Sequence, residues 1–253
     1  MITVNRDHPG ITLLTLNRPE KRNSLSIKLM EEIIAAVRET NEMPDQRVLV
    51  IRGEGPSFCT GLDLKEAADL SIAEDSANAI ANMLLEVYLS SVITIASVKG
   101  HAIAGGAGLS SVCDYVIAGE NSTFGFPEVH RGLVPAIVLT FLQRQLKERD
   151  MRELFLMGDL VTAEHAHRIG LVNQVVPEEM LEEDTMSHAK KALRGGPSSV
   201  AHLKRLMEHF FLDDLKKDLE HALALHKVVR THQEAQEGIK AFMEKRQPNW
   251  NLQ

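Results

Sequence analysis

The chain has 253 residues, 44% of them apolar and 25% charged, which is typical of a globular protein and excludes disordered and collagen-like classes. Its formal net charge of -7 gives no overall attraction for nucleic acid, so any anionic ligand must be held by a local cluster of basic residues. The N-terminus lacks the charged-then-apolar pattern of a signal peptide, and no apolar run approaches the ~20 residues of a membrane span, so we expect neither export nor a membrane partner. The two cysteines, Cys59 and Cys113, fit reduced, buried thiols better than a disulfide framework, so we expect a cytoplasmic location.

The N-terminal segment is predicted to form a β-hairpin followed by a helix. Apolar and polar residues alternate at positions 2–5 and 11–16, around a turn that contains Pro9 and Gly10. After the hairpin, Ser26 is suited to cap a helix, because the apolar residues that follow it recur at the spacing of one helical face.

Short apolar runs then alternate with helical sequence as far as Pro177. Because strands alternate with helices, we expect an α/β protein with a mostly parallel sheet. Beyond Pro177 the strand patterns stop, and a helical C-terminal portion is expected from about residue 195 onward. The further strands predicted before that point lie at residues 47–53, 92–97, 115–119 and 170–176.

Two glycine-centred bends, "GPSFCTGLDLKE" and "GHAIAGGAGLSS", each follow a predicted strand. Both could direct backbone N–H groups into a shared cleft, where two such donors stabilise negative charge that develops on a carbonyl oxygen. Glycine supplies the donor without a side chain in the way. The alternative is that these glycines only make tight turns and allow close packing of helix on sheet.

Four segments, "NRPEKRNSLS", "FCTGLDLKE", "GHAIAGGAGLSSVCDYVIA" and "FGFPEVHRGLVP", occur in an order and spacing that resemble the enoyl-CoA hydratase/isomerase family, the crotonases. The resemblance covers essentially the whole chain. It implies a crotonase-like spiral of strand-strand-helix repeats with the acyl-CoA site in residues 1–194, and a helical trimerisation region in residues 195–253. The implied assembly is a homotrimer or a dimer of trimers, and the implied context is fatty-acid or branched-chain catabolism.

The resemblance also implies the chemistry of the site. An acyl-CoA thioester is the expected substrate, with coenzyme A as part of that substrate, and neither a separate cofactor nor a metal is expected. The oxyanion-hole donors that match the family are the N–H groups of Leu62 and Gly105, and Glu128 matches its catalytic carboxylate. The apolar residues beside Glu128 are expected to raise the pKa of its carboxyl toward neutrality. Without the motif, Glu128 would be interpreted as a solvated loop residue or a partner of Arg131.

Further residues match positions that approach coenzyme A or its pantetheine arm. For Lys65, a solvated surface charge is an alternative, and for the two positions near the C-terminus the alternative is helix packing. His130 and Arg131 could replace a catalytic group that the chain lacks or bind a substrate carboxylate, and the alternative is an ordinary role at the surface or at the rim of the cleft. The full set of expected contacts is Lys21, Arg22, Cys59, Gly61, Asp63, Leu64, Lys65, Phe242 and Lys245.

The chain departs from the family pattern at Gly108. Two-carboxylate hydratases of the family place their second glutamate at the matching position, and they divide the addition of water between both carboxylates. Moving a double bond from C3 to C2 needs only one base, so we expect isomerisation rather than hydration. Leu62 at the donor position also favours an isomerase, and thioester hydrolysis ranks lower because Ala136 stands near the position of the hydrolase acid.

Two other functions stay open at this point. One is an enoyl-CoA hydratase that uses Glu128 with another water-positioning group, or that acts on a branched or carboxylated acyl chain. The other is a non-catalytic acyl-CoA-binding or protein-binding member of the family.

The sequence indicates neither a nucleophilic triad nor a metal site. Ser110, Ser111 and Cys113 have no histidine and acid at a spacing that would activate them as nucleophiles. The histidines are not accompanied by acidic or cysteine residues at a recognised metal-ligand spacing.

Overall fold

The predicted strands assemble into a six-stranded sheet in the computed structural model, which describes residues 1–250 apart from the side chain of Leu64. The strand order is β1-β2-β3-β4-β6-β9, and only the β1/β2 hairpin is antiparallel. The predicted hairpin and the mostly parallel sheet are therefore confirmed. The strands are β1 (Ile2–His8), β2 (Ile11–Leu16), β3 (Val48–Gly53), β4 (Ile93–Val98), β6 (Tyr115–Gly119) and β9 (Gln174–Val176).

A second, three-stranded sheet was not predicted from the sequence. It contains β5 (His101–Ile103), β7 (Thr123–Gly125) and β8 (Val161–Thr162), in the order β5-β7-β8. Each long strand β4 and β6 thus continues into a short strand of this sheet before the chain turns into a helical segment. These units are the strand-strand-helix repeats of the expected spiral.

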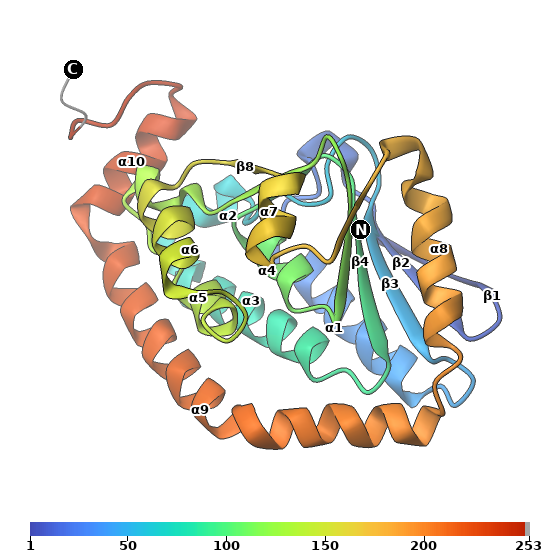
Figure 1. Ribbon diagram of the computed structural model, residues 1–253. Helices are drawn as coiled ribbons and strands as arrows, with labels where there is room; N and C mark the ends of the chain where they lie inside the picture. Colours follow the sequence, from blue (N-terminus) through green and yellow to red (C-terminus); the bar gives the residue numbers. More distant parts are fainter. Residues whose placement is uncertain (251–253) are drawn as a thin grey trace.

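Helices cover both faces of the large sheet. Figure 1 shows α8 (Leu181–Ala192) on one face and α1 (Ile27–Glu42) with α3 (Ala73–Tyr88) on the other. Ser26 caps α1 as predicted, because its side chain accepts a hydrogen bond from the Leu29 N–H at 3.2 Å. The remaining α-helices before the C-terminal region are α2 (Leu64–Ala68), α4 (Gly105–Ser111), α5 (Ala136–Leu142), α6 (Glu148–Arg152) and α7 (Ala163–Ile169).

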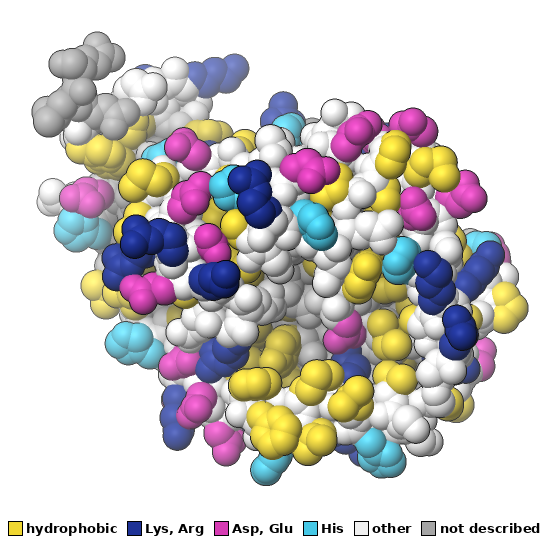
Figure 2. Space-filling view, in the orientation of Figure 1, with side chains coloured by type: hydrophobic (Ala, Val, Ile, Leu, Met, Phe, Trp, Pro, Cys, Tyr) yellow, Lys and Arg dark blue, Asp and Glu magenta, His cyan; other side chains and the backbone are white. Residues whose placement is uncertain are grey.

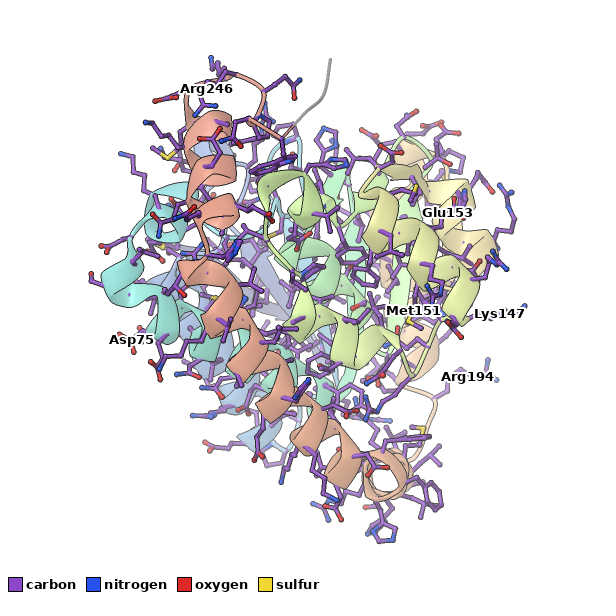
Figure 3. All side chains as sticks on the ribbon, turned by 90° about the vertical axis from the view of Figure 1, so that its left-hand side faces the viewer. Asp75, Lys147, Met151, Glu153, Arg194 and Arg246 are labelled. Carbon is purple, nitrogen blue, oxygen red and sulfur yellow. The ribbon has the colours of Figure 1, made fainter. Side chains whose placement is uncertain are left out.

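The C-terminal region is helical, as expected. The long helix α9 (Pro197–Thr231) begins with a proline at its first position and runs around the molecule to the side that carries α5 and α2 (Figure 1). Figure 3 shows it crossing in front of the fold, between α3, which carries Asp75, and α6, which carries Met151. In the described residues, neither α9 nor any shorter helix has the apolar length that a bilayer crossing requires.

The last helix, α10 (Gln233–Met243), packs on the short 3-10 helix η3 (Pro127–Arg131) and on α2. Two glycines make this contact close. A Cβ at Gly238 would lie 2.3 Å from the Arg131 carbonyl oxygen, and a Cβ at Gly132 would lie 2.6 Å from the Glu234 backbone. The C-terminal helices therefore cover the loop that carries Glu128.

Candidate active site

The two glycine-centred bends, η3 and the C-terminal helices surround a cavity of about 560 Å³. The cavity wall combines apolar side chains from α3 and α5 with a few charged ones from the loops and α9. Most of the residues predicted from the sequence to contact the ligand lie on this wall: Lys21, Arg22, Leu62, Asp63, Lys65, Gly105, Glu128 and Phe242.

In the first bend, the residues on both sides of Leu62 are held by backbone hydrogen bonds to Leu25. The Leu25 N–H donates to the Gly61 carbonyl at 2.8 Å, and the Asp63 N–H donates to the Leu25 carbonyl at 2.8 Å. Asp63 then caps α2 by accepting from the Lys65 N–H, and its carboxylate pairs with Arg18 at 3.1 Å. These contacts fix the backbone on both sides of Leu62.

The second bend places Gly105 beside the first. Gly61 has a φ of +84°, and a Cβ there would lie 2.8 Å from the Ala104 Cβ and 3.3 Å from the Gly105 nitrogen. Gly61 does not itself line the cavity. Its lack of a side chain allows the two loops that carry the Leu62 and Gly105 N–H groups to approach each other closely. Gly105 is the first residue of α4, so its N–H has no acceptor within the helix. Across the described residues, no backbone hydrogen bond uses the N–H of Leu62 or of Gly105.

Glu128 is held in a site that favours its neutral form. It lies on η3 and lines the cavity, while its Oε2 is buried and has no hydrogen-bond partner in the described structure. Burial raises the pKa of the Glu128 carboxyl to about 7, against the lowering effects of a backbone hydrogen bond and of the Arg131 charge. The predicted rise of this pKa is confirmed. A carboxyl with this pKa can both accept and return a proton near neutral pH.

No space is open for a side chain at position 108, where the resemblance places the second carboxylate of hydratases. A Cβ at Gly108 would lie 2.7 Å from Cγ2 and 3.2 Å from Cγ1 of Val138, which is buried and lines the cavity from α5. Real Cβ atoms essentially never make contacts as short as 2.7 Å. A longer side chain at position 108 therefore needs Val138 to move, and Glu128 is the one carboxylate that η3 and α4 direct to this part of the cavity.

Some of the expected ligand contacts lie elsewhere. Cys59 is fully buried in the core, and its backbone N–H and carbonyl pair with the backbone of β5. Burial raises the pKa of the Cys59 thiol to about 12, and both cysteines are free. Lys245 is exposed beyond the end of α10 and does not line the cavity of this chain. Leu64 begins α2, but its side chain lies outside the described part of the structure.

His130 does not face the cavity. It is exposed and is not among the residues that line the cavity, and its Nε2 lies 2.7 Å from the Met157 carbonyl. Arg131 does line the cavity, where its guanidinium stacks over the Phe242 ring at 4.2 Å from the centroid. Of the two basic residues that follow Glu128, only Arg131 is therefore placed to meet a ligand.

Two further cavity residues were missed by the sequence analysis as ligand contacts. His226 and Arg230 lie one turn apart on α9 and line the cavity together. Burial, together with the charge of Arg230, lowers the pKa of His226 to about 4, so its imidazole is neutral at physiological pH. Their spacing of four residues was visible in the sequence, but nothing in it indicated that α9 returns to the site.

Known proteins share similarity with almost the whole chain. Residues 6–253 match the enoyl-CoA hydratase/isomerase family. The chain is 33% identical over 257 residues to mouse "Enoyl-CoA hydratase domain-containing protein 3, mitochondrial", which covers 99% of the chain and 84% of that protein. It is 30% identical over 241 residues to the 2,3-dehydroadipyl-CoA hydratase of Escherichia coli, which covers 95% of the chain and 94% of that enzyme.

Solved structures show the same relationship. The crystal structure of an enoyl-CoA hydratase from Mycobacterium avium superimposes with a TM-score of 0.90 at 30% identity, over 99% of this chain and 98% of that one. The fold is thus the crotonase fold that the sequence resemblance implied. The chain belongs to the enoyl-CoA hydratase/isomerase family of acyl-CoA enzymes.

Proposed function

We propose that this protein isomerises the double bond of an enoyl-CoA thioester, converting a 3-enoyl into a 2-enoyl chain. The observation that carries the proposal is the single carboxylate at the reacting end of the cavity, where Val138 fills the space next to Gly108. Double-bond migration needs one group that moves a proton, whereas hydration by two carboxylates needs a second one.

In the proposed mechanism, the thioester oxygen accepts hydrogen bonds from the N–H groups of Leu62 and Gly105. The Glu128 carboxylate removes a proton from C2, and the electrons move into a dienolate whose oxygen is stabilised by the two donors. Removing one such donor typically costs about 3 to 4 kcal/mol of transition-state stabilisation. Glu128 then returns the same proton to C4, which leaves the double bond between C2 and C3.

The coenzyme A part of the substrate is proposed to lie across the open side of the cavity. Lys21, Arg22 and Lys65 line the cavity and are exposed, so they can bind phosphates at a low desolvation cost. Coenzyme A enters and leaves as part of the substrate, and the mechanism uses no separate cofactor. For each of these three residues, substitution by alanine should weaken binding more at low salt than at high salt.

Assembly into a homotrimer or a dimer of trimers is part of the same proposal. Figure 2 shows apolar side chains gathered along the edge of the molecule where α9 runs. Contiguous exposed apolar surface of this kind marks contact sites in soluble proteins. The exposed large apolar residues in this part of α9 are Leu203, Leu206, Met207, Phe210 and Phe211.

Hydration is the second candidate, and the names of the relatives favour it. The mouse and Escherichia coli relatives are both named as hydratases or hydratase-domain proteins. With Gly108 in place of a glutamate, Glu128 would have to serve both the attacking water and C2 through a relayed proton. This mechanism predicts slower hydration than one that divides the work between two carboxylates.

One spectroscopic experiment separates the two candidates. Purified protein is mixed with 3-hexenoyl-CoA or with 2-hexenoyl-CoA, and the absorbance of the conjugated thioester is followed, with the Glu128→Gln variant in parallel. Gain of absorbance from the 3-enoyl substrate, lost in the variant, supports the isomerase. Loss of absorbance from the 2-enoyl substrate without any gain from the 3-enoyl substrate would overturn isomerisation in favour of hydration.

A further inference from the structure

Two arginines on the cavity wall have no anionic partner in the described residues. Arg230 is 3% exposed, and Arg131 is partly buried. Neither takes part in any of the ion pairs among the described residues. The Nε atoms of both are buried without a hydrogen-bond partner. A buried charge is stable in a fold when it is paired, so an unpaired buried guanidinium in a cavity indicates an anion supplied by a ligand.

The two guanidiniums are held in place by neutral contacts. Arg230 donates from Nη2 to the Ala67 carbonyl of α2, and Arg131 donates from Nη1 to the Pro127 carbonyl at 3.3 Å. Arg131 also stacks on Phe242. These contacts orient both side chains and leave N–H groups free, and a planar guanidinium fork suits a carboxylate. Their positions are thus set before a ligand binds.

The buried charges on the cavity wall do not balance. Burial lowers the pKa of Arg131 and the charge of Glu128 raises it, yet no ion pair joins these two wall residues in the described structure. Of the other two carboxylates on the wall, Asp63 is already paired with Arg18, and Glu20 is exposed to solvent. Even with Glu128 ionised, the two arginines leave one positive charge in excess. His226, whose pKa is lowered, adds none.

We propose that Arg131 and Arg230 bind a carboxylate at the far end of the acyl chain, so that the substrates are ω-carboxylated acyl-CoA thioesters. This inference rests on the proposed function, because it assigns the substrate class of the same site. One carboxylate neutralises the excess charge and fills the empty donor positions.

The phosphates of coenzyme A are the other possible anions. They are strongly charged and hydrated groups, and the exposed Lys21, Arg22 and Lys65 are available to them on the open side. Arg230 is too deeply buried beside α2 to meet a solvated diphosphate without losing its packing. A carboxylate at the end of a slender acyl chain reaches such a position at much lower desolvation cost.

Binding of saturated thioesters tests the inference without any chemistry. Isothermal titration compares adipoyl-CoA with hexanoyl-CoA, which differ only in carrying a carboxylate or a methyl group at C6. Glutaryl-CoA against pentanoyl-CoA and suberoyl-CoA against octanoyl-CoA extend the comparison to shorter and longer chains. A charge-assisted pair predicts roughly ten- to a hundredfold tighter binding of the carboxylated member at the best length.

The Arg230→Met variant should lose this preference and bind hexanoyl-CoA at least as tightly as the wild type does. Arg131→Met gives the same test if Arg230→Met does not fold, as judged by circular dichroism. Arg22→Ala is the matched control, because it should weaken both members of a pair equally.

Three results would contradict the inference. Equal or tighter binding of the uncharged member at every length would show that the arginines do not select a carboxylate. Equal loss of affinity for both members in Arg230→Met would show that this arginine binds coenzyme A instead. Absence of binding to any acyl-CoA would instead refute the proposed function, and with it the inference that rests on it.

Discussion

Glu128→Gln should abolish activity and stabilise the protein at neutral and alkaline pH. In the wild type, folding buries Oε2 without a hydrogen-bond partner and raises the pKa of the carboxyl to about 7, from 4.5 in the unfolded chain. The site that makes the carboxyl a usable base therefore destabilises its ionised form. Glutamine keeps nearly the same shape but carries no charge at any pH.

The sign and size of the effect follow from proton linkage. Between about pH 4.5 and about pH 7 the folded state binds more protons than the unfolded state, so this carboxyl makes the wild type less stable as the pH rises. A full shift of this size corresponds to about 3 kcal/mol at alkaline pH. From about pH 5 to about pH 8, the stability of Glu128→Gln relative to the wild type should therefore increase by roughly 2.5 kcal/mol.

Urea unfolding at a fixed protein concentration, measured at both pH values, gives this difference. Asp69→Asn is a control of opposite sign. The Asp69 carboxylate is exposed and accepts hydrogen bonds from the Ser71 N–H and hydroxyl, which lower its pKa. That variant should lose stability relative to the wild type at neutral pH, and the loss should shrink as the pH falls. A pH-independent difference between Glu128→Gln and the wild type would refute the account of a charge-disfavouring site.

Other properties follow from the same geometry. A Cβ at Gly108 would lie 2.7 Å from Val138, so the steric contact in Gly108→Ala should destabilise the protein by roughly 1 to 3 kcal/mol. The higher helix propensity of alanine should offset about 1 kcal/mol of this cost. The double variant Gly108→Ala/Val138→Ala should lose less unfolding free energy than the two single variants lose in sum, because the shorter side chain at position 138 removes the contact. A loss equal to that sum would argue against the contact. The rate constant kcat/KM should fall about tenfold per pH unit below about pH 7, where Glu128 becomes protonated, and a flat profile down to about pH 5 would exclude it as the base. Phe210→Asp should reduce the mass measured by light scattering to that of a monomer, whereas an unchanged mass would place the subunit contact elsewhere.

Local sequence signals were sufficient for the large elements. The hydroxyl of Ser26 and the apolar spacing behind it marked the start of α1, and the β-branched run of β3 marked a buried strand. The small sheet was missed because strands of two or three residues, such as Val161–Thr162, are too short to show any period. Their pairing depends on the path of the whole spiral, which short windows of sequence do not contain.

The same distinction applies to the site. Leu62, Gly105 and Glu128 lie within contiguous motifs, so the family pattern placed them. Cys59 lies within one of those motifs too, but its side chain packs into the core because its backbone pairs with β5. Arg230 lies in no motif, and it reaches the cavity only because α9 spans the molecule and returns to α2. Cavity residues that lie outside the motifs are therefore harder to predict from this sequence than those within them.

In the proposed chemistry, the two backbone donors and Glu128 together form and protonate a thioester enolate. Exchange of the C2 protons of hexanoyl-CoA in D₂O, followed by NMR, measures this step directly and does not depend on whether isomerisation or hydration follows. We expect enzyme-dependent exchange at C2 that is lost in Glu128→Gln and retained in a variant of an exposed carboxylate, Glu120→Gln. Exchange that continues unchanged in Glu128→Gln would contradict it.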